Sequence, residues 1–275
     1  MKVIECFGSS KNRCSFSQSY SEGSSWRAYK VSDVIWVGGS SLPMVPEADK
    51  LSSEFTFGCM ESETGLFRGQ IVDGIMGMSA AHDTLAFRLY SNKITKSRAF
   101  SMCFRVGGGV LTLGGLDTRL NYGDMKYIRL VKSSGWFTVR LLEVFIRSGK
   151  DKTNVKSVDA TSQKYNSGKG CIVDSGTTDT YLPSSISYQF NSIFKELAGI
   201  AYSNKPMDIK PEIFEGLPVI VFKFESTNGK PVYIEMPPES YSEQLDVNKY
   251  AFRIYVNEVR DNYTFFLLII YRGIS

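Results

Sequence analysis

Short runs of mixed polar and apolar residues, separated by turns that contain glycine, make up most of the sequence. Runs of this length that are rich in aromatic and β-branched residues predict strands. Two of them, at residues 16–20 and 26–37, flank the turn Ser21–Ser25 and predict a hairpin, in which Gly23 supplies a positive φ. Further strands are predicted at residues 55–59, 100–106, 110–113, 125–130, 137–146, 218–224 and 232–236.

Two segments break this pattern with the spacing of helices. Residues 84–90 predict a short helix with Asp83 as its N-cap, and residues 185–197 predict a longer one. The longer helix carries its apolar residues on one face, namely Ile186, Phe190, Ile193, Phe194 and Leu197. The polar stretch 150–170 predicts a surface hairpin or insertion.

The strand pattern stops at Gly114–Thr118 and restarts after a loop, with no low-complexity linker between the two parts. Strand-rich segments that lie next to each other without a linker are expected to pack directly. We therefore predict two β-rich lobes, residues 1–118 and residues 119–275, with only minor helices.

Composition and charge exclude several classes of protein. The chain has 275 residues, of which 43% are hydrophobic and 22% are charged, as in an ordinary globular protein. The formal net charge is only +4, and the Lys and Arg residues are scattered along the chain. Because nucleic-acid binding needs basic residues gathered on one face, no nucleic-acid partner is predicted.

The cysteines and the single histidine limit the possible chemistry. No two of the five cysteines have the Cys-x-x-Cys spacing of a zinc or redox site, and His82 is the only histidine. We therefore predict no metal, and no Ser–His or Cys–His nucleophile. Cys6 and Cys14 bracket a short polar loop, which predicts a small disulfide or half of a disulfide cluster and favours an oxidising compartment.

The two ends give weaker signals. The first residues lack a long apolar segment, so no signal peptide is predicted. Residues 265–271 are apolar, but a membrane-spanning helix needs about 20 such residues. We expect a buried strand there, or the start of a longer segment, so that a membrane anchor would exist only in a longer form.

Residues 171–178, Cys-Ile-Val-Asp-Ser-Gly-Thr-Thr, are the strongest candidate for chemistry. An apolar strand delivers Asp174 onto a tight glycine turn at the edge of a packed core. Asp, Ser and Gly all favour turns, so a plain turn is the simplest interpretation. The apolar residues before Asp174 and the hydroxyls of Thr177 and Thr178 after it favour an oriented carboxylate instead. This turn occurs only once in the sequence.

Two further motifs are weaker when taken alone. Tyr20 precedes the tip of the predicted hairpin, where it either leans over a cleft or simply packs on the sheet. Asp73–Met78 contains an apolar pair followed by glycine, which permits close approach of another backbone or side chain. Taken alone, the motif favours a strand that ends in a bulge.

In this order the motifs resemble those of the pepsin-like aspartic peptidases, which have an Asp-Thr/Ser-Gly turn in each lobe, a Tyr-bearing flap and an apolar-apolar-Gly motif that closes each active-site loop. The matching segments are Tyr20–Trp26, Asp73–Gly77, Val110–Asp117, Gly135–Val139 and Ile172–Thr178. The residues around the flap most resemble protist secretory-pathway members, including plasmepsin-like enzymes. The resemblance implies an all-β, bilobal pepsin-like acid-protease fold with an incomplete first lobe.

The resemblance also implies roles. Asp174 would be the second of two carboxylates that share a proton and activate a water. Ser175 would form a hydrogen bond between the lobes, Gly176 would complete the turn, and Thr177 would bind the outer carboxylate oxygen. The flap residues implied to bind substrate are Tyr20, Gly23 and Ser24, and the closing motif is Ile75, Met76 and Gly77. A polypeptide would lie extended between the lobes of a monomer in the secretory pathway or outside the cell, with no metal or cofactor.

Two features of the family are missing from the sequence. A first Asp-Thr/Ser-Gly turn should precede the flap by several dozen residues, yet only 19 residues precede Tyr20. The second lobe should also end in its own apolar-apolar-Gly motif. We therefore expect a chain shortened at both ends that has lost nearly all peptidase activity. An inactive peptide-binding homologue on the same fold, or an unrelated β-rich structural protein, are the alternatives.

Overall fold

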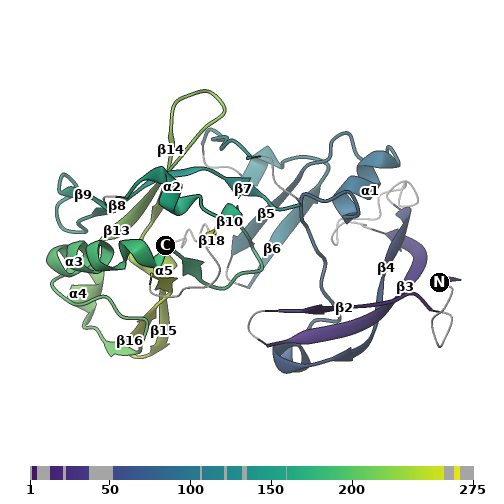
Figure 1. Cartoon of the computed structure of the whole chain (residues 1–275), viewed down its shortest axis with the longest axis horizontal. Helices are drawn as coiled ribbons and strands as arrows, with labels where there is room; N and C mark the ends of the chain where they lie inside the picture. Colours follow the sequence, from purple (N-terminus) through teal and green to yellow (C-terminus); the bar gives the residue numbers. More distant parts are fainter. Residues whose placement is uncertain are drawn as a thin grey trace. The chain divides into compact units, whose positions relative to one another are not determined.

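The computed structural model describes residues 2–4, 13–20, 23–36, 52–105, 107–120, 123–131, 135–158, 160–256 and 263–266. Strands dominate these residues, and the helices are few and short (Figure 1). The predicted all-β class is confirmed.

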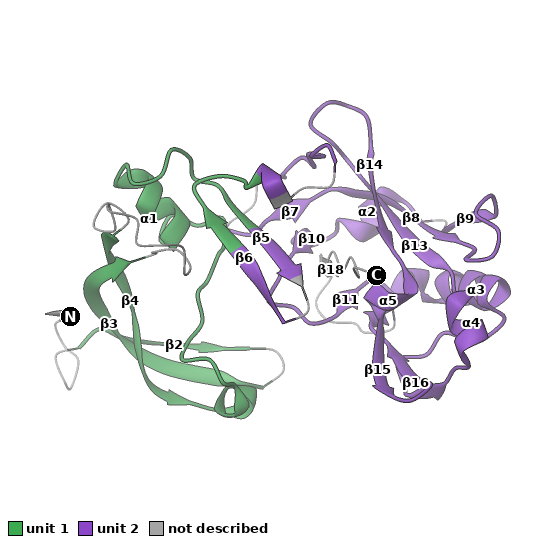
Figure 2. Cartoon of the chain, turned by 180° about the vertical axis from the view of Figure 1, so that it is seen from behind, with its two compact units in different colours: residues 1–101, 111–117 green, residues 102–110, 118–275 purple. Residues whose placement is uncertain are grey.

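The chain divides into two compact units (Figure 2). Unit 1 contains residues 1–101 and 111–117, and unit 2 contains residues 102–110 and 118–275. The hairpin of β5 (Phe100–Arg105) and β6 (Gly108–Leu113) contributes residues to both. That the two units are the lobes predicted at residues 1–118 and 119–275 stays a prediction.

Unit 1 is built around one long strand, β3 (Ser25–Trp36). It pairs antiparallel with β4 (Ser52–Glu63) and, at separate stretches, with β2 (Ser15–Ser19) and β1 (Lys2–Val3). The predicted hairpin of residues 16–20 and 26–37 is confirmed. The 3-10 turn η2 (Gly65–Gly69) and the helix α1 (Leu85–Ser91) follow β4. The N-cap position of α1 is Thr84, so the prediction of Asp83 at that position was wrong by one residue.

Besides its share of the β5–β6 hairpin, unit 2 contains three sheets in its described residues. A five-stranded sheet has the order β17-β11-β18-β10-β7, a four-stranded sheet the order β14-β13-β8-β9, and a three-stranded sheet the order β12-β16-β15. The strands are β7 (Thr138–Val139), β8 (Leu141–Arg147), β9 (Val155–Val158), β10 (Gly170–Val173), β11 (Thr180–Tyr181), β12 (Met207–Asp208), β13 (Val219–Phe224), β14 (Val232–Met236), β15 (Ser242–Asp246), β16 (Lys249–Phe252), β17 (Ile254–Tyr255) and β18 (Tyr263–Phe266). The helices and 3-10 turns are η3 (Thr118–Leu120), α2 (Ser162–Tyr165), η4 (Ser184–Ile186), α3 (Ser187–Ala198), α4 (Pro211–Glu215) and α5 (Pro238–Tyr241).

The longest helix, α3, covers the core of unit 2. Its residues Phe190, Ile193 and Phe194 are buried, whereas Tyr188 on the opposite face is 89% exposed. Gly199 ends the helix with a φ of +73°, a conformation that glycine adopts without strain. The helix predicted at residues 185–197 is confirmed, with its first turn formed as the separate 3-10 turn η4.

Two predictions about strands in this unit were wrong. Residues 125–130 form no strand and make only isolated bridges, because Ile128 and Leu130 pair with different partners. The strand expected at residues 137–146 breaks at Arg140, since β7 and β8 belong to different sheets. The stretch 150–170 was predicted to be a surface hairpin or insertion, and the hairpin is present, because β9 pairs antiparallel with β8 and residues 150–157 are mostly exposed. The later part of the stretch is not surface, since Val158 and Tyr165 are fully buried.

The apolar residues near the end of the sequence contribute a strand to the five-stranded sheet. Residues 263–266 form β18, which runs parallel to β10 and antiparallel to β11. The remaining residues of the predicted apolar segment, 267–271, lie outside the described part of the chain. No helix among the described residues is long and apolar enough to cross a membrane.

An ion pair crosses the four-stranded sheet. The two terminal nitrogens of Arg147 in β8 donate to the two carboxylate oxygens of Glu235 in β14, each over 2.6 Å. These hydrogen bonds lower the pKa of Glu235 and raise that of Arg147. Because the Glu235 side chain is 52% exposed, solvent screens the pair and limits its contribution to stability.

We expect Glu235→Gln to lower the free energy of unfolding at pH 7 by no more than about 1 kcal/mol. The folded state lowers the pKa of Glu235, so the stabilisation is present above the unfolded pKa of about 4.3 and is lost as the pH falls through the folded pKa. Urea unfolding at pH values from 7 down to 3 should show the two proteins converging at low pH. Glu239→Gln, at an exposed position of α5, is the control, and a Glu235→Gln effect independent of pH would contradict this account.

Candidate active-site turn and flap

Asp174 directly follows β10 and is held by its own turn. The Gly176 amide donates to Asp174 Oδ1 over 2.9 Å, and Thr177 Oγ1 donates to Oδ2 over 2.6 Å. The carboxylate is half-buried, and each of its oxygens has one donor from the turn. The hydrogen bond implied for Thr177 is therefore present, while the catalytic role of Asp174 stays a prediction.

Gly176 has a steric role in this turn. A Cβ at residue 176 would lie 3.3 Å from Asp174 Oδ1, which is tighter than an ordinary contact. A larger residue would therefore press on the carboxylate that the Gly176 amide binds. Ser175, the neighbouring residue, is exposed, and its implied hydrogen bond between lobes stays a prediction.

The strand before the turn is fixed on both edges. β10 pairs with β18 on one side and with β7 on the other, and the Val173 amide donates to the Phe137 carbonyl over 2.9 Å. Cys171 and Ile172 are buried, and burial raises the pKa of the Cys171 thiol to about 12. This cysteine is thus a neutral core residue that anchors the strand.

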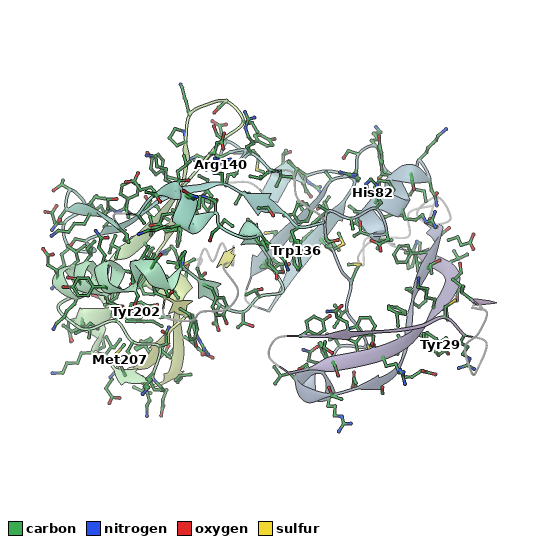
Figure 3. All side chains as sticks on the ribbon, viewed as in Figure 1. Tyr29, His82, Trp136, Arg140, Tyr202 and Met207 are labelled. Atoms are coloured by element: carbon green, nitrogen blue, oxygen red, sulfur yellow. The ribbon has the colours of Figure 1, made fainter. Side chains whose placement is uncertain are left out.

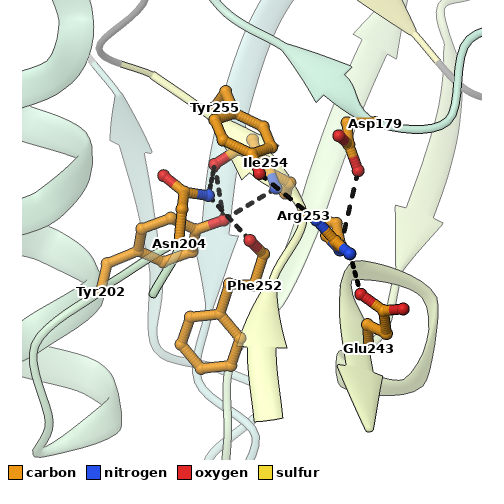
Figure 4. Close-up of polar contacts among 8 residues, drawn as sticks. All are labelled: Asp179, Tyr202, Asn204, Glu243, Phe252, Arg253, Ile254 and Tyr255. Atoms are coloured by element: carbon orange, nitrogen blue, oxygen red, sulfur yellow. Dashed lines mark hydrogen bonds and ion pairs between the residues drawn. The ribbon is translucent and has the colours of Figure 1, made fainter. Parts of the chain in front are cut away.

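A polar cluster fixes the strand that leaves the turn (Figure 4). The Thr180 amide in β11 donates to the Arg253 carbonyl over 3.0 Å, and the Arg253 guanidinium pairs with Glu243 and lies 3.8 Å from Asp179 Oδ1. Asp179 is only five residues after Asp174. In the sequence, the signal for this cluster is a second carboxylate beside an apolar segment, Asp179 before Tyr181–Leu182.

Tyr202 and Asn204 complete the cluster at Ile254 in β17 (Figure 4). The hydroxyl of the half-buried Tyr202 donates to the Ile254 carbonyl over 2.8 Å and accepts the Ile254 amide over 3.0 Å. Asn204 Nδ2 donates to the carbonyls of Ile254 and Phe252. Burial raises the pKa of Tyr202, so the phenol stays neutral. Because β17 pairs with β11, these bonds support the segment that follows the Asp174 turn.

The predicted flap is part of unit 1. Gly23, at the tip between β2 and β3, has a φ of +99°, as the turn was predicted to need. Tyr20 is 37% exposed, and its hydroxyl accepts a hydrogen bond from Trp26 Nε1 over 3.2 Å. Ser24 is only 1% exposed. Ser21 and Glu22 lie outside the described residues.

The motif of Ile75, Met76 and Gly77 lies on the surface of unit 1. Ile75 and Met76 are 51% and 50% exposed, and residues 70–80 form neither helix nor strand. The strand end expected here was therefore wrong, because the described strands of this unit all pair elsewhere. The implied closing role of these residues stays a prediction.

The remaining sequence candidates add no second site among the described residues. His82 precedes α1 and packs edge-on against Phe87, with 4.6 Å between ring centroids (Figure 3). No group of three potential metal ligands occurs in the described part of the chain. Cys6 lies outside the described residues, so the predicted loop disulfide stays a prediction.

Comparison with known proteins gives a consistent result. A family model described as eukaryotic aspartyl protease matches residues 7–251. Aspartic protease 5 of Toxoplasma gondii is 34% identical over 117 residues, which are 41% of this chain and 12% of that protein. Plasmepsin V of Plasmodium falciparum (isolate 3D7) is 30% identical over 118 residues, 42% of this chain and 19% of that protein. Aspartic proteinase 36 of Arabidopsis thaliana is 27% identical over 259 residues, 88% of this chain and 49% of that protein. The chain thus spans half or less of the length of these relatives.

We expect Tyr202→Phe to lower the free energy of unfolding by about 1–3 kcal/mol, because the buried Ile254 amide would lose its acceptor. The Ile254 carbonyl would keep its bond from Asn204. Urea unfolding at neutral pH measures the change. Tyr188→Phe removes the same hydroxyl from an exposed position of α3 and should leave stability unchanged. An equal loss of unfolding free energy in Tyr202→Phe and Tyr188→Phe would show that the hydrogen bonds of the Tyr202 hydroxyl contribute nothing specific to stability.

Proposed function

Because the chain belongs to the eukaryotic aspartyl protease family, as the resemblance of its motifs implied, we propose that it carries one half of the catalytic machinery of an aspartic endopeptidase. Asp174 is the catalytic carboxylate in this proposal. The observation that carries it is the pair of hydrogen bonds, from the Gly176 amide and from Thr177 Oγ1, which fixes both oxygens of Asp174 at the end of a buried strand.

The reaction needs a second carboxylate close to Asp174. Two carboxylates a few ångströms apart share one proton, so one is an acid while the other is a base. The base takes a proton from a water, whose oxygen attacks the scissile carbonyl carbon, while the acid donates to the carbonyl oxygen. The tetrahedral intermediate then breaks its C–N bond: the carboxyl that took the water proton donates it to the leaving nitrogen, and the other carboxylate accepts a proton from a hydroxyl of the intermediate.

The turn prepares Asp174 for such a role. One donor on each oxygen fixes the plane of the carboxylate and leaves a lone pair on each oxygen for a water or for the second carboxylate. Positioning of this kind removes the reorientation that would otherwise accompany proton transfer. The second Asp-Thr/Ser-Gly turn is not in this sequence, so we propose that the active species obtains that carboxylate from outside it.

Unit 1 provides the proposed flap. Tyr20 at the hairpin tip would close over an extended polypeptide and exclude water from the reacting groups. We propose that the peptidase works as a monomer without metal or cofactor. The loop bracketed by Cys6 and Cys14 favours an oxidising compartment, and hence the secretory pathway or the extracellular space.

A peptide-binding protein without catalysis is the second candidate. The observation that favours it is the single Asp-Ser-Gly turn in the sequence. Binding of an extended peptide depends on the flap and the apolar surfaces, and it does not need a proton-sharing pair.

We expect Asp174→Asn to abolish cleavage of peptide substrates by the longest native product that contains this sequence. An amide cannot act as base, so the loss should be about 10³-fold or more. Cleavage of a peptide library at pH 4 to 7, followed by mass spectrometry, measures it. Asp208→Asn, at an exposed position of β12, is the control and should retain full activity.

The outcomes separate the candidates. Cleavage that survives Asp174→Asn would overturn the proposed role of this carboxylate. A native product that binds the library peptides but cuts none of them would support the binding protein instead. A product that neither binds nor cuts would contradict both.

A further inference from the structure

The flap is fastened to a second segment of unit 1, the turn Thr64–Gly69. The backbone amide of Thr64 donates to the Ser25 carbonyl over 2.8 Å, and the Ser25 amide donates to Thr64 Oγ1 over 3.0 Å. The hydroxyls of Ser25 and Thr64 are 2.8 Å apart and share a hydrogen bond. Thr64 Oγ1 also donates to the Ser25 carbonyl over 3.3 Å, so four hydrogen bonds connect the start of β3 to the residue that precedes η2.

Ser24 makes the innermost contact between the two segments. Its side chain is buried, and Ser24 Oγ accepts the backbone amide of Leu66 over 2.9 Å. The first amides of a helical turn have no partner within the turn, so Ser24 supplies an acceptor that η2 lacks. On the flap side, the Ser24 carbonyl accepts the Tyr20 amide over 2.9 Å. Ser24 therefore links η2 directly to the backbone of Tyr20.

The approach of Ser24 depends on a glycine in the turn. A Cβ at residue 65 would lie 2.5 Å from Ser24 Oγ and 2.9 Å from Ser24 Cα, distances that real Cβ atoms do not show. Gly65 also has a φ of +62°, which favours glycine. At Gly69, the other end of the same turn, an added Cβ would meet no atom within 4 Å, and the backbone φ is not in the positive range that favours glycine. The close packing is thus specific to the end that faces Ser24.

Aromatic rings extend the contact to the flap tyrosine. The rings of Tyr20 and Phe67 pack edge-on with 5.3 Å between centroids, and Trp26 Nε1 donates to the Tyr20 hydroxyl. Trp26 in turn packs edge-on against Phe16 at 5.2 Å. The position of Tyr20 is therefore set from three sides, by Trp26, by Phe67 and through its own backbone by Ser24.

We propose that Ser24 is a positioning residue, which joins the flap tip and the turn Gly65–Gly69 into one unit that moves together. The sequence assigned Ser24 to substrate binding, but its hydroxyl is buried and already bound to Leu66. Tyr20 and Leu66 remain 37% and 68% exposed, so the joined segments present one apolar surface to a polypeptide. The role in substrate binding rests on the proposed function, whereas the coupling of the two segments does not.

Hydrogen exchange in the ligand-free chain tests the coupling. In Ser24→Ala the Leu66 amide loses its acceptor, and we expect its exchange rate to rise about tenfold. The Tyr20 and Gly23 amides should exchange faster by a similar factor, because they depend on the same unit. In Gly65→Ala the added Cβ would push against Ser24, so the amides of Leu66, Tyr20 and Gly23 should again exchange faster.

A spectroscopic readout separates positioning from a local packing effect. With 5-fluorotryptophan, the resonance of Trp26, assigned from Trp26→Phe, should shift in both Ser24→Ala and Gly65→Ala, although neither residue is an aromatic neighbour of Trp26. Ser17→Ala, at an exposed serine of β2, and Gly69→Ala are the matched controls and should leave the resonance and the three amides unchanged.

Two results would overturn the proposal. One is faster exchange at Leu66 alone, with the Tyr20 and Gly23 amides and the Trp26 resonance unchanged. The other is an equal response in the control variants. A fluorescein-labelled octapeptide with leucine at its centre tests the substrate role separately, since it should slow exchange at Leu66 and Gly23 together in the wild type. Its failure to bind would contradict the proposed function and leave the measured coupling intact.

Discussion

The pairing of β10 on both edges is the constraint on which the geometry of unit 2 depends. The strand lies between β18 and β7, and its residues Cys171 and Ile172 are buried. Neighbouring side chains of a strand point to opposite faces, so both faces of β10 are covered, and a shift of register by one residue would exchange every side chain with the opposite face. Asp174 follows the strand directly, and its position is therefore set by the core rather than by the loop. The turn then has only to orient the carboxylate.

Both candidate segments use a glycine to let a polar contact form. In unit 2, the missing Cβ of Gly176 leaves room for Asp174 Oδ1 against the Gly176 amide. In unit 1, the missing Cβ of Gly65 leaves room for Ser24 Oγ against the next amide in the chain, that of Leu66. Each contact replaces a hydrogen bond to water by an internal one, and such an exchange is favourable only if the partners can approach to normal distance. A glycine is therefore a steric requirement at residue 65, where a Cβ would lie 2.5 Å from Ser24 Oγ, whereas at residue 176 a Cβ would crowd Asp174 Oδ1 at 3.3 Å.

The predictions from sequence were correct for segments whose hydrogen bonds join residues close together in the sequence. The hairpin around Gly23 and the turn after Val173 follow from the residues next to them, and their hydrogen bonds span only a few positions. The predictions failed where partners lie far apart. Tyr165 is buried in the core of unit 2 together with residues as distant in sequence as Phe222 and Phe252, and Arg253 approaches Asp179 across 74 residues of sequence. The polar composition of residues 150–170 predicted that Tyr165 lies at the surface, and the sequence gave no partner for Arg253. Both depend on contacts with distant residues, which the local pattern does not contain.

The proposed cleavage and the alternative of peptide binding have different physical requirements. Acid and base catalysis by a carboxylate pair needs one protonated and one ionised group at the same moment, and a single carboxylate cannot be both. The hydrogen bonds on Asp174 fix its orientation but supply no second proton-sharing group. Contacts with a peptide have no such requirement, because apolar surface and backbone hydrogen bonds act one by one. The exposed side chains of Tyr20 and Leu66 belong to unit 1 and lie on segments joined by Ser24, independently of the Asp174 turn. The fold of the family is therefore compatible with peptide cleavage and with peptide binding alike. Only cleavage depends on whether a second carboxylate lies beside Asp174.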